Sequence, residues 1–249
     1  MRIDDDDDLL GMRAAGLAVH AALEAMRAAV APGVTTADLD AVAARVMREH
    51  GARSAPQLVY DFPGVTCISL NDELVHGIPS RTRRVAEGDL VKLDVTFEKA
   101  GYMADAAVTV AVGRVAPRAR ALAECAERAF ERALREVRPG RRVREVGRAI
   151  EKFVRDEGFS VVPMLQGHGI GRTIHEEPMV PNWADPAADS VLTEGLVITV
   201  EPIIAMGGGD AYEASDGWTI RTADGSVAAH HEHTLVVRRD GPLLLTGAA

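Results

Sequence analysis

The stretch from residue 90 to 112 constrains the fold most, because its hydrophobic pattern is that of a hairpin. In residues 91–97 every odd position is apolar and every even position is polar, which is typical of a half-buried strand. A turn around residues 99–101 leads to a second strand over 102–112. Strands joined by so short a turn pair antiparallel, since a parallel pair needs a long crossover. The chain therefore contains hairpins rather than a run of strand–helix–strand units.

Helical and extended segments surround this hairpin. Residues 9–31 are rich in Ala and Leu and end at Pro32-Gly33, which predicts a helix and its end. We expect further helices over 35–50, 117–137 and 143–157, irregular or extended chain over 58–70, and strands over 159–163, 196–204, 218–222, 227–238 and 242–246. This order predicts an α+β fold. We expect residues 1–8 to form a flexible acidic leader and residues 9–249 to form a single domain.

The composition narrows the class of protein. The 249 residues are 47% hydrophobic and 26% charged, and their net charge of −9 provides no electrostatic signal for nucleic-acid binding. No apolar stretch reaches the roughly 20 residues that span a bilayer, and the N-terminus, with its run from Asp4 to Asp8, lacks the apolar core of a signal peptide. Cys67 and Cys125 lack the spacing of a metal or redox motif, so we expect reduced thiols in a cytoplasmic protein that does not bind membranes.

Each strand of the hairpin carries one aspartate, Asp94 or Asp105. With a turn centred near residues 99–100, these two residues stand directly opposite each other, with Cβ atoms ~4.5–5.5 Å apart. Opposed carboxylates repel unless a divalent cation or a shared proton resolves the repulsion. The hairpin alone leaves three interpretations open: a metal site, a pair that shares a proton, or a solvated polar face.

A glycine-rich segment, GHGIGRTIHEEP at residues 167–178, contains His168 and His175. The glycines predict a tight loop in which the backbone and the imidazoles approach another group closely. A single histidine in such a loop is more often structural. Two histidines in one segment favour a functional site.

Two glutamates lie in or next to apolar strands. Glu201 interrupts LVITVEPII, where a charge is costly unless it is paired or bound to a metal. Pro202 after it cannot donate to a sheet, which predicts a strand edge, a bulge or a strand end. Glu232 begins the apolar strand in HHEHTLVV. Each glutamate alone could form a buried ion pair instead.

Taken together, Asp94, Asp105, His168, Glu201 and Glu232 form a coherent ligand set. Four carboxylates carry a formal charge of −4, which two divalent cations balance. Oxygen donors with one nitrogen suit Mn, Fe(II), Co or Zn, and the set has no thiolate of the kind a structural zinc site uses. Sites with two such metals are typical of hydrolases, in which the metals activate a hydroxide and polarise the scissile carbonyl.

The motifs SLNDELVHGIP (69–79), VKLDVT (91–96), GHGIGRTIHEEP, VITVEPII and HHEHTLVV occur in the order and spacing of methionine aminopeptidases. From about residue 9 to 239 the chain resembles a short bacterial type I member of this family. The resemblance implies a pita-bread fold, in which a curved antiparallel sheet with pseudo-twofold symmetry carries helices on its outer face. It also implies removal of the initiator methionine from nascent proteins when the second residue is small.

The resemblance also assigns roles to residues. It implies that Asp94 binds one of two metals, that Asp105 and Glu232 bridge both, and that His168 and Glu201 bind the other. Glu201 would also carry a proton to the leaving amine. The substrate contacts that it implies are His76 near the scissile bond, His175 at the substrate carbonyl, and Phe62, Cys67 and Trp218 around the methionine side chain. We expect a monomer that acts on N-terminal methionine peptides in the cytoplasm, in association with the ribosome.

The chain departs from the family pattern at three places. The run Tyr60-Asp61-Phe62 is shorter than usual, Ala106-Ala107 replaces hydroxyl residues, and His230 stands where a glutamine is usual. Two alternatives remain: an Xaa-Pro aminopeptidase or prolidase of the same fold, and a catalytically inactive homologue that acts as a binding protein. A di-iron redox protein is disfavoured because these residues contain no Glu-x-x-His pair.

Overall fold

The hairpin lies at the centre of the structure. In the computed structural model, which describes residues 1–247, strands β4 (Leu90–Lys99) and β5 (Tyr102–Ala111) pair antiparallel. They belong to a nine-stranded sheet of order β1-β4-β5-β14-β9-β7-β8, with β2 on β4 and β15 on β14. The other members are β1 (Arg53–Ser54), β2 (Cys67–Leu70), β7 (Gln166–Gly169), β8 (Glu176–Pro181), β9 (Val197–Val200), β14 (Glu232–Val236) and β15 (Leu243–Leu244).

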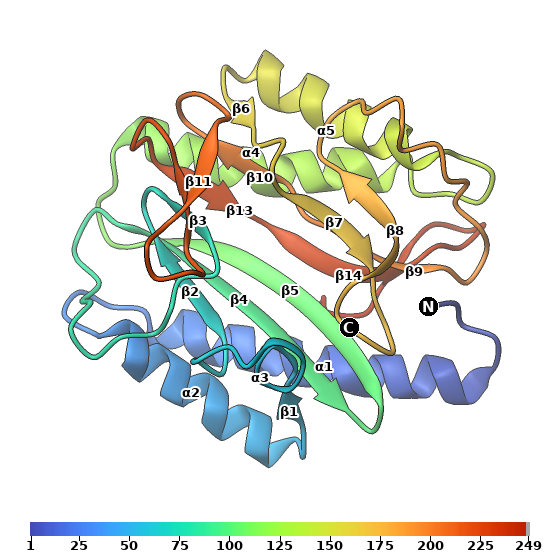
Figure 1. Ribbon diagram of the computed structural model, residues 1–249, viewed down its shortest axis with the longest axis horizontal. Helices are drawn as coiled ribbons and strands as arrows, with labels where there is room; N and C mark the ends of the chain where they lie inside the picture. Colours follow the sequence, from blue (N-terminus) through green and yellow to red (C-terminus); the bar gives the residue numbers. More distant parts are fainter. Residues whose placement is uncertain (248–249) are drawn as a thin grey trace.

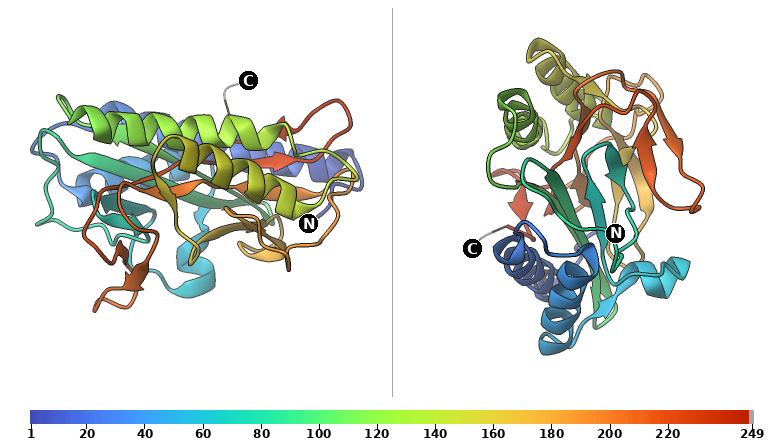
Figure 2. Two further views of the ribbon diagram at one scale, coloured as in Figure 1. Left: turned by 90° about the horizontal axis from the view of Figure 1, so that it is seen from above. Right: turned by 90° about the vertical axis from the view of Figure 1, so that its left-hand side faces the viewer.

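Two pairs of helices cover one side of this sheet (Figure 1). Helices α1 (Asp6–Ala29) and α2 (Thr36–Glu49) share a hydrophobic core with β4 and β5. Helices α4 (Pro117–Leu134) and α5 (Val143–Asp156) share a second core with β9 and β14. Figure 2 shows these four helices on one side of the sheet and the short helix α3 (Ala55–Tyr60) on the other. Each half of the sheet thus has its own helical pair, which confirms the predicted α+β architecture.

The N-terminal helix begins at Asp6, three residues earlier than predicted. The Asp5 side chain accepts a hydrogen bond from the Asp8 amide, and the acidic first turn is favourable beside the positive end of the helix dipole. The amino group of Met1 donates to the Ile170 carbonyl at 3.0 Å. The Met1 contact ties the start of the chain to the residue that follows β7. The division into a flexible leader and one domain stays a prediction.

Helix α1 also corrects the expectation about membrane segments. By length and composition alone it is apolar enough to cross a membrane. Its buried residues, among them Met12, Val19 and Met26, lie in the hydrophobic core shared with α2, β4 and β5. A core helix of a soluble protein meets the same criterion, and the packing of α1 accounts for its apolar face.

Two three-stranded sheets complete the fold. One contains β3 (Glu73–Val75), β11 (Ala211–Glu213) and β12 (Ile220–Thr222), and the other contains β6 (Ser160–Val161), β10 (Ile203–Ala205) and β13 (Ala228–His230). The predicted strands 196–204 and 227–238 are therefore each divided between two sheets. The first divides at Glu201-Pro202, as the missing amide of Pro202 predicts.

The glycine-rich segment is a β-hairpin rather than a loop throughout. His168 lies on β7 and Glu176 begins β8. A Cβ at Gly167 would lie 2.7 Å from the Thr199 carbonyl oxygen, and one at Gly169 would lie 2.4 Å from that of Glu177. The glycines therefore serve close packing of β7 between β9 and β8, where a side chain would clash. The segment over 58–70 also differs from the prediction, because α3 ends within it before β2 begins.

Candidate metal centre

The register of the hairpin differs from the predicted one by two residues. Asp94 stands opposite Ala107, and Asp105 stands opposite Thr96. The turn is centred on Ala100 and Gly101, which both have positive φ (51° and 85°), a combination typical of a two-residue turn. The two aspartates are therefore diagonal neighbours on one face of the sheet, a spacing across which side chains can still interact. The predicted proximity holds, whereas the direct opposition was wrong.

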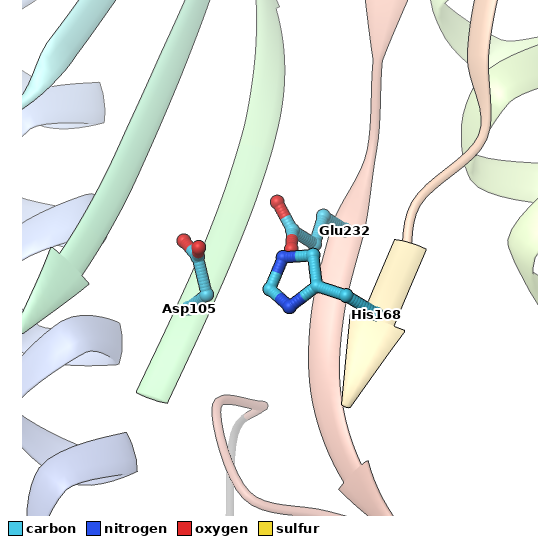
Figure 3. Close-up of side chains that lie close together, drawn as sticks. All are labelled: Asp105, His168 and Glu232. Atoms are coloured by element: carbon cyan, nitrogen blue, oxygen red, sulfur yellow. The ribbon is translucent and has the colours of Figure 1, made fainter. Parts of the chain in front are cut away.

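Strand β14 brings the next carboxylate to the same face. Glu232 stands opposite Ala107, so Asp94, Ala107 and Glu232 form a row across three strands. The alanine side chain is small and leaves space between the two carboxylates. Asp105, His168 and Glu232 each offer one ligand atom within 4.8 Å of the other two. Figure 3 shows these three side chains converging from β5, β7 and β14.

The ring of His168 is oriented by its neighbours. Its Nδ1 atom lies 2.9 Å from the carbonyl oxygen of Gly169, which can only accept, so Nδ1 carries the proton. Nε2 is then free to act as a metal ligand, an arrangement common among metal-binding histidines. Nε2 lies 3.6 Å from Oε1 of Glu201. The two side chains therefore face a shared space.

Thr199 links His168 to Glu201. Its hydroxyl accepts a hydrogen bond from the His168 amide at 3.0 Å and donates to Oε1 of Glu201 at 2.8 Å. Thr234 plays a similar part on the other side of the site, because its hydroxyl accepts from the Asp105 amide at 2.9 Å and donates to the Asp105 carbonyl at 2.8 Å. Both threonines are fully buried. They hold the backbone that carries the candidate ligands.

Asp105, Glu201 and Glu232 are buried and Asp94 is partly buried, and none of the four forms an ion pair with a lysine or arginine within residues 1–247. Burial, and then the charges of its neighbours, raises the pKa of Asp94 well above its usual range. Burial likewise raises the pKa values of Asp105, Glu201 and Glu232. Within residues 1–247, their ion-pair contacts are with histidines only. Such a cluster is costly unless cations balance it.

Two buried carboxylate oxygens without a hydrogen-bond partner among the described residues also indicate a metal site. Oδ1 of Asp105 and Oε1 of Glu232 are buried and have no hydrogen-bond partner among the described residues. Buried polar atoms normally have a partner, so their lone pairs indicate a missing ligand. Carboxylate oxygens and imidazole nitrogens are the donors that divalent transition metals accept. The residues present therefore fit a divalent metal centre.

Two cavities meet at this cluster. One, of about 90 Å³, is lined mainly by apolar side chains, among them Phe62, Cys67 and Trp218. The other, of about 230 Å³, is lined by the carboxylates with His168 and His230. Four residues line both cavities: His76, Asp94, Asp105 and His175. The structure thus brings every residue selected from the sequence to one place.

Within the apolar cavity, the rings of Phe62 and Trp218 pack edge to face with centroids 5.1 Å apart. Cys67 stands opposite Asp94 on β2, and burial raises the pKa of its thiol, so it lines the wall as a neutral group. The His175 ring lies 4.3 Å from that of His168, centroid to centroid.

Two residues near the site were missed as participants. The hydroxyl of Tyr60, at the end of α3, contacts Nδ1 of His175. His230 places a ring nitrogen within 4.8 Å of carboxylate oxygens of Glu201 and Glu232. No sequence signal marks Tyr60. His230 could have been found, because the predicted strand 227–238 would place residues two apart on one face and Glu232 was already selected, although in the structure the two residues lie on separate strands, β13 and β14.

Comparisons with known proteins agree with this site. Residues 11–239 match metallopeptidase family M24. The chain is 42% identical to methionine aminopeptidase 2 of Bacillus subtilis (strain 168) over 247 residues, covering 99% of each. Its structure is similar to that of methionine aminopeptidase from Thermotoga maritima, with a TM-score of 0.96, 34% identity and 100% coverage of both chains.

A more distant likeness shows the fold alone. Prolidase from Pyrococcus furiosus superimposes with a TM-score of 0.80 at 23% identity, covering 98% of this chain and 65% of that one. The pita-bread fold implied by the resemblance is confirmed by these neighbours. The family match covers most of the chain and includes every candidate ligand. The chain belongs to metallopeptidase family M24.

Proposed function

We propose that this protein is a methionine aminopeptidase that removes the initiator methionine from nascent proteins when the second residue is small. The observation that carries the proposal is that an apolar cavity adjoins the cavity lined by the carboxylates and histidines, because several residues line both. A side chain in the first cavity places the adjacent peptide bond at the second. The 42% identity to a methionine aminopeptidase, against 23% to a prolidase, favours this substrate over Xaa-Pro peptides.

The centre would hold two divalent cations, drawn from Co, Mn, Fe(II) or Zn. Asp94 would bind one, His168 and Glu201 would bind the other, and Asp105 and Glu232 would serve both. When bound, the metals supply Lewis acidity and activate water as a nucleophile. The orphaned oxygens of Asp105 and Glu232 support the bridging role, since each has lone pairs without a partner.

Two side chains carry the proton chemistry. Oε1 of Glu201 lies 3.6 Å from Nε2 of His168, so the carboxylate faces the shared space of the centre, where it can accept a proton from water and pass it to the leaving amine. The Tyr60 hydroxyl contacts Nδ1 of His175, and in the proposed tautomer it donates to Nδ1 and the imidazole proton is on Nε2. His175 then donates from Nε2 to the scissile carbonyl oxygen as negative charge develops there. His76 contacts the substrate next to that bond.

Specificity for methionine arises in the apolar cavity. Phe62 and Trp218 form two walls, and the neutral thiol of Cys67 adds a third. An unbranched thioether side chain makes favourable contacts with aromatic rings. We also propose that the enzyme is a monomer that acts in the cytoplasm on chains emerging from the ribosome; the buried free thiols of Cys67 and Cys125 are compatible with a reducing compartment.

The test is hydrolysis of two sets of peptides by the metal-loaded protein, with chelator-treated protein as the control. Release of methionine from Met-Ala peptides, and no release from Xaa-Pro peptides, is expected. Release of the residue before proline with no cleavage of Met-Ala would replace this proposal with the prolidase alternative. Loss of activity on metal removal and its return on re-addition would establish that the centre is required.

A further inference from the structure

The ring of His230 is buried beside the proposed metal centre. It ends strand β13 and is 2% exposed, and neither Nδ1 nor Nε2 has a hydrogen-bond partner among the described residues. A neutral imidazole has one N–H donor and one nitrogen lone pair, and in this position both are unsatisfied within the described chain. Burial of this kind is costly, so the ring indicates a partner that the protein itself does not supply.

The backbone of His230 is held firmly. Its amide donates to the Thr109 hydroxyl at 2.9 Å, and that hydroxyl donates back to the His230 carbonyl at 2.8 Å. His230 also stands opposite Ile203, the first residue of the neighbouring strand β10. Glu201 and Pro202 directly precede Ile203 in the chain. These contacts fix the ring beside both glutamates of the centre.

The distances to those glutamates fit shared coordination. Nε2 of His230 lies 3.3 Å from Oε2 of Glu232 and 3.9 Å from Oε2 of Glu201. Neither contact is a hydrogen bond, because Nε2 has no hydrogen-bond partner within residues 1–247. Neighbouring donor atoms that surround one five-coordinate ion at about 2.1 Å stand roughly 3.0–3.6 Å apart. The measured separations are close to that spacing.

We propose that His230 is a further metal ligand, which supplies a second imidazole nitrogen to the cation that His168, Glu201, Asp105 and Glu232 would bind. The inference rests on the proposed metal-dependent function and adds a ligand to its five. One metal then has two nitrogen donors, whereas the metal bound by Asp94 keeps oxygen donors only. Imidazole favours Zn, Fe, Cu and Ni over Mn, which prefers oxygen ligands. His230 therefore lowers the preference for Mn at the position that has two nitrogen donors.

The test compares His230→Gln, which introduces the residue usual in the family, with His231→Gln. His231 is the adjacent residue, but its ring packs against Phe130 of α4, with centroids 5.2 Å apart, and lies outside the cluster. X-ray absorption of protein loaded with two equivalents of Zn counts the imidazoles bound to metal. Competition with a chelator gives the affinities for Zn and Mn. A second variant, His230→Asn, and the circular dichroism of all the variants separate ligand loss from misfolding.

We expect His230→Gln to lower the count of bound imidazoles from two per chain to one. Zn affinity should fall by about 10–100-fold or more, the range seen when groups supporting a metal ligand are removed, and Mn affinity should fall less. His231→Gln should change neither quantity. An unchanged imidazole count in folded His230→Gln, or equal losses of Zn and Mn affinity, would overturn the assignment.

The same samples separate the two proposals. If wild-type protein cleaves Met-Ala but binds metal through one imidazole, the assignment of His230 fails while the proposed function stands. If wild-type protein binds metal through two imidazoles but releases no methionine, the proposed function fails while the assignment stands.

Discussion

Thr199→Val removes one hydroxyl and leaves the shape of the side chain nearly unchanged. That hydroxyl is fully buried and has two partners, the His168 amide at 3.0 Å and Oε1 of Glu201 at 2.8 Å. Valine can satisfy neither, so a buried donor and a buried acceptor both become orphaned. At roughly 1–2 kcal/mol for each, the free energy of unfolding should fall by about 2–4 kcal/mol.

The same change should weaken metal binding, because Thr199 orients two of the proposed ligands. Loss of a group that orients a ligand typically costs about 10–100-fold in metal affinity. Thr199→Ser is the matched control: it keeps the hydroxyl and loses a buried methyl group, which costs about 1 kcal/mol. Its metal affinity should stay close to that of the wild type.

Urea unfolding of metal-free protein measures the free energy of unfolding, and competition with a chelator measures the metal affinity. For a chain of this length, 1 kcal/mol shifts Tm by about 2–4 °C, so calorimetry gives an independent check. The reasoning is refuted if Thr199→Val unfolds within about 0.5 kcal/mol of the wild type, the range of a neutral surface change. Equal metal affinities for Thr199→Val and Thr199→Ser would refute the orienting role separately.

Three further predictions concern activity and pH. His175→Ala should lower kcat by about 10²–10³-fold, as expected for loss of a donor to the developing oxyanion, and metal analysis should find full metal content; loss of metal would show that its role is different. Trp218→Ala opens one wall of the apolar cavity, and steady-state kinetics should give a KM for Met-Ala about 10-fold higher or more, the scale of burying a few methylene groups; an unchanged KM would place the methionine side chain elsewhere. In metal-free protein the raised pKa values of the buried carboxyl groups mean that the folded state binds more protons than the unfolded state. Their contribution to stability is therefore complete below about pH 4, the unfolded value, and is lost as pH rises through the folded values, about 7 for Asp105. Calorimetry should accordingly show that added metal raises Tm more at pH 8 than at pH 5, and an equal rise at both would contradict this linkage.

The sequence pattern was sufficient to predict which residues meet, but the register required the structure. Alternation over residues 91–97 predicted the strand β4 correctly, but the strand is buried on both faces rather than half-buried. The centre of the turn was misplaced because Ala100 adopts a positive φ of 51°, which is unusual for a residue with a side chain. A one-residue shift of the turn centre changes the opposed pairs by two residues. Both aspartates stay on one face under such a shift, which is why the expected proximity survived.

The prediction of a loop for the glycine-rich segment was wrong for a different reason. Local propensity disfavours strands there, because glycine weakens them. The structure places β7 between β8 and β9, where packing leaves no space for a Cβ at Gly167 or Gly169. The requirement at Gly169 comes from Glu177 in the same segment, but the requirement at Gly167 comes from Thr199 on β9. Because β9 follows later in the chain, the requirement at Gly167 cannot be read from residues 167–178 alone.

The position of the centre in the sheet explains why its candidate ligands are far apart in the sequence. The two halves of the nine-stranded sheet join where β5 pairs with β14, through only two opposed pairs, Glu232 with Ala107 and His233 with Ala106. Threonine hydroxyls reinforce this seam: Thr234 bonds both backbone groups of Asp105, and Thr109 bonds both backbone groups of His230. Asp94 and Asp105 come from one half, and His168, Glu201 and Glu232 come from the other. A centre of this kind draws a ligand from each strand that borders the seam, so its residues are distant in sequence and their geometry is set by how the two halves join.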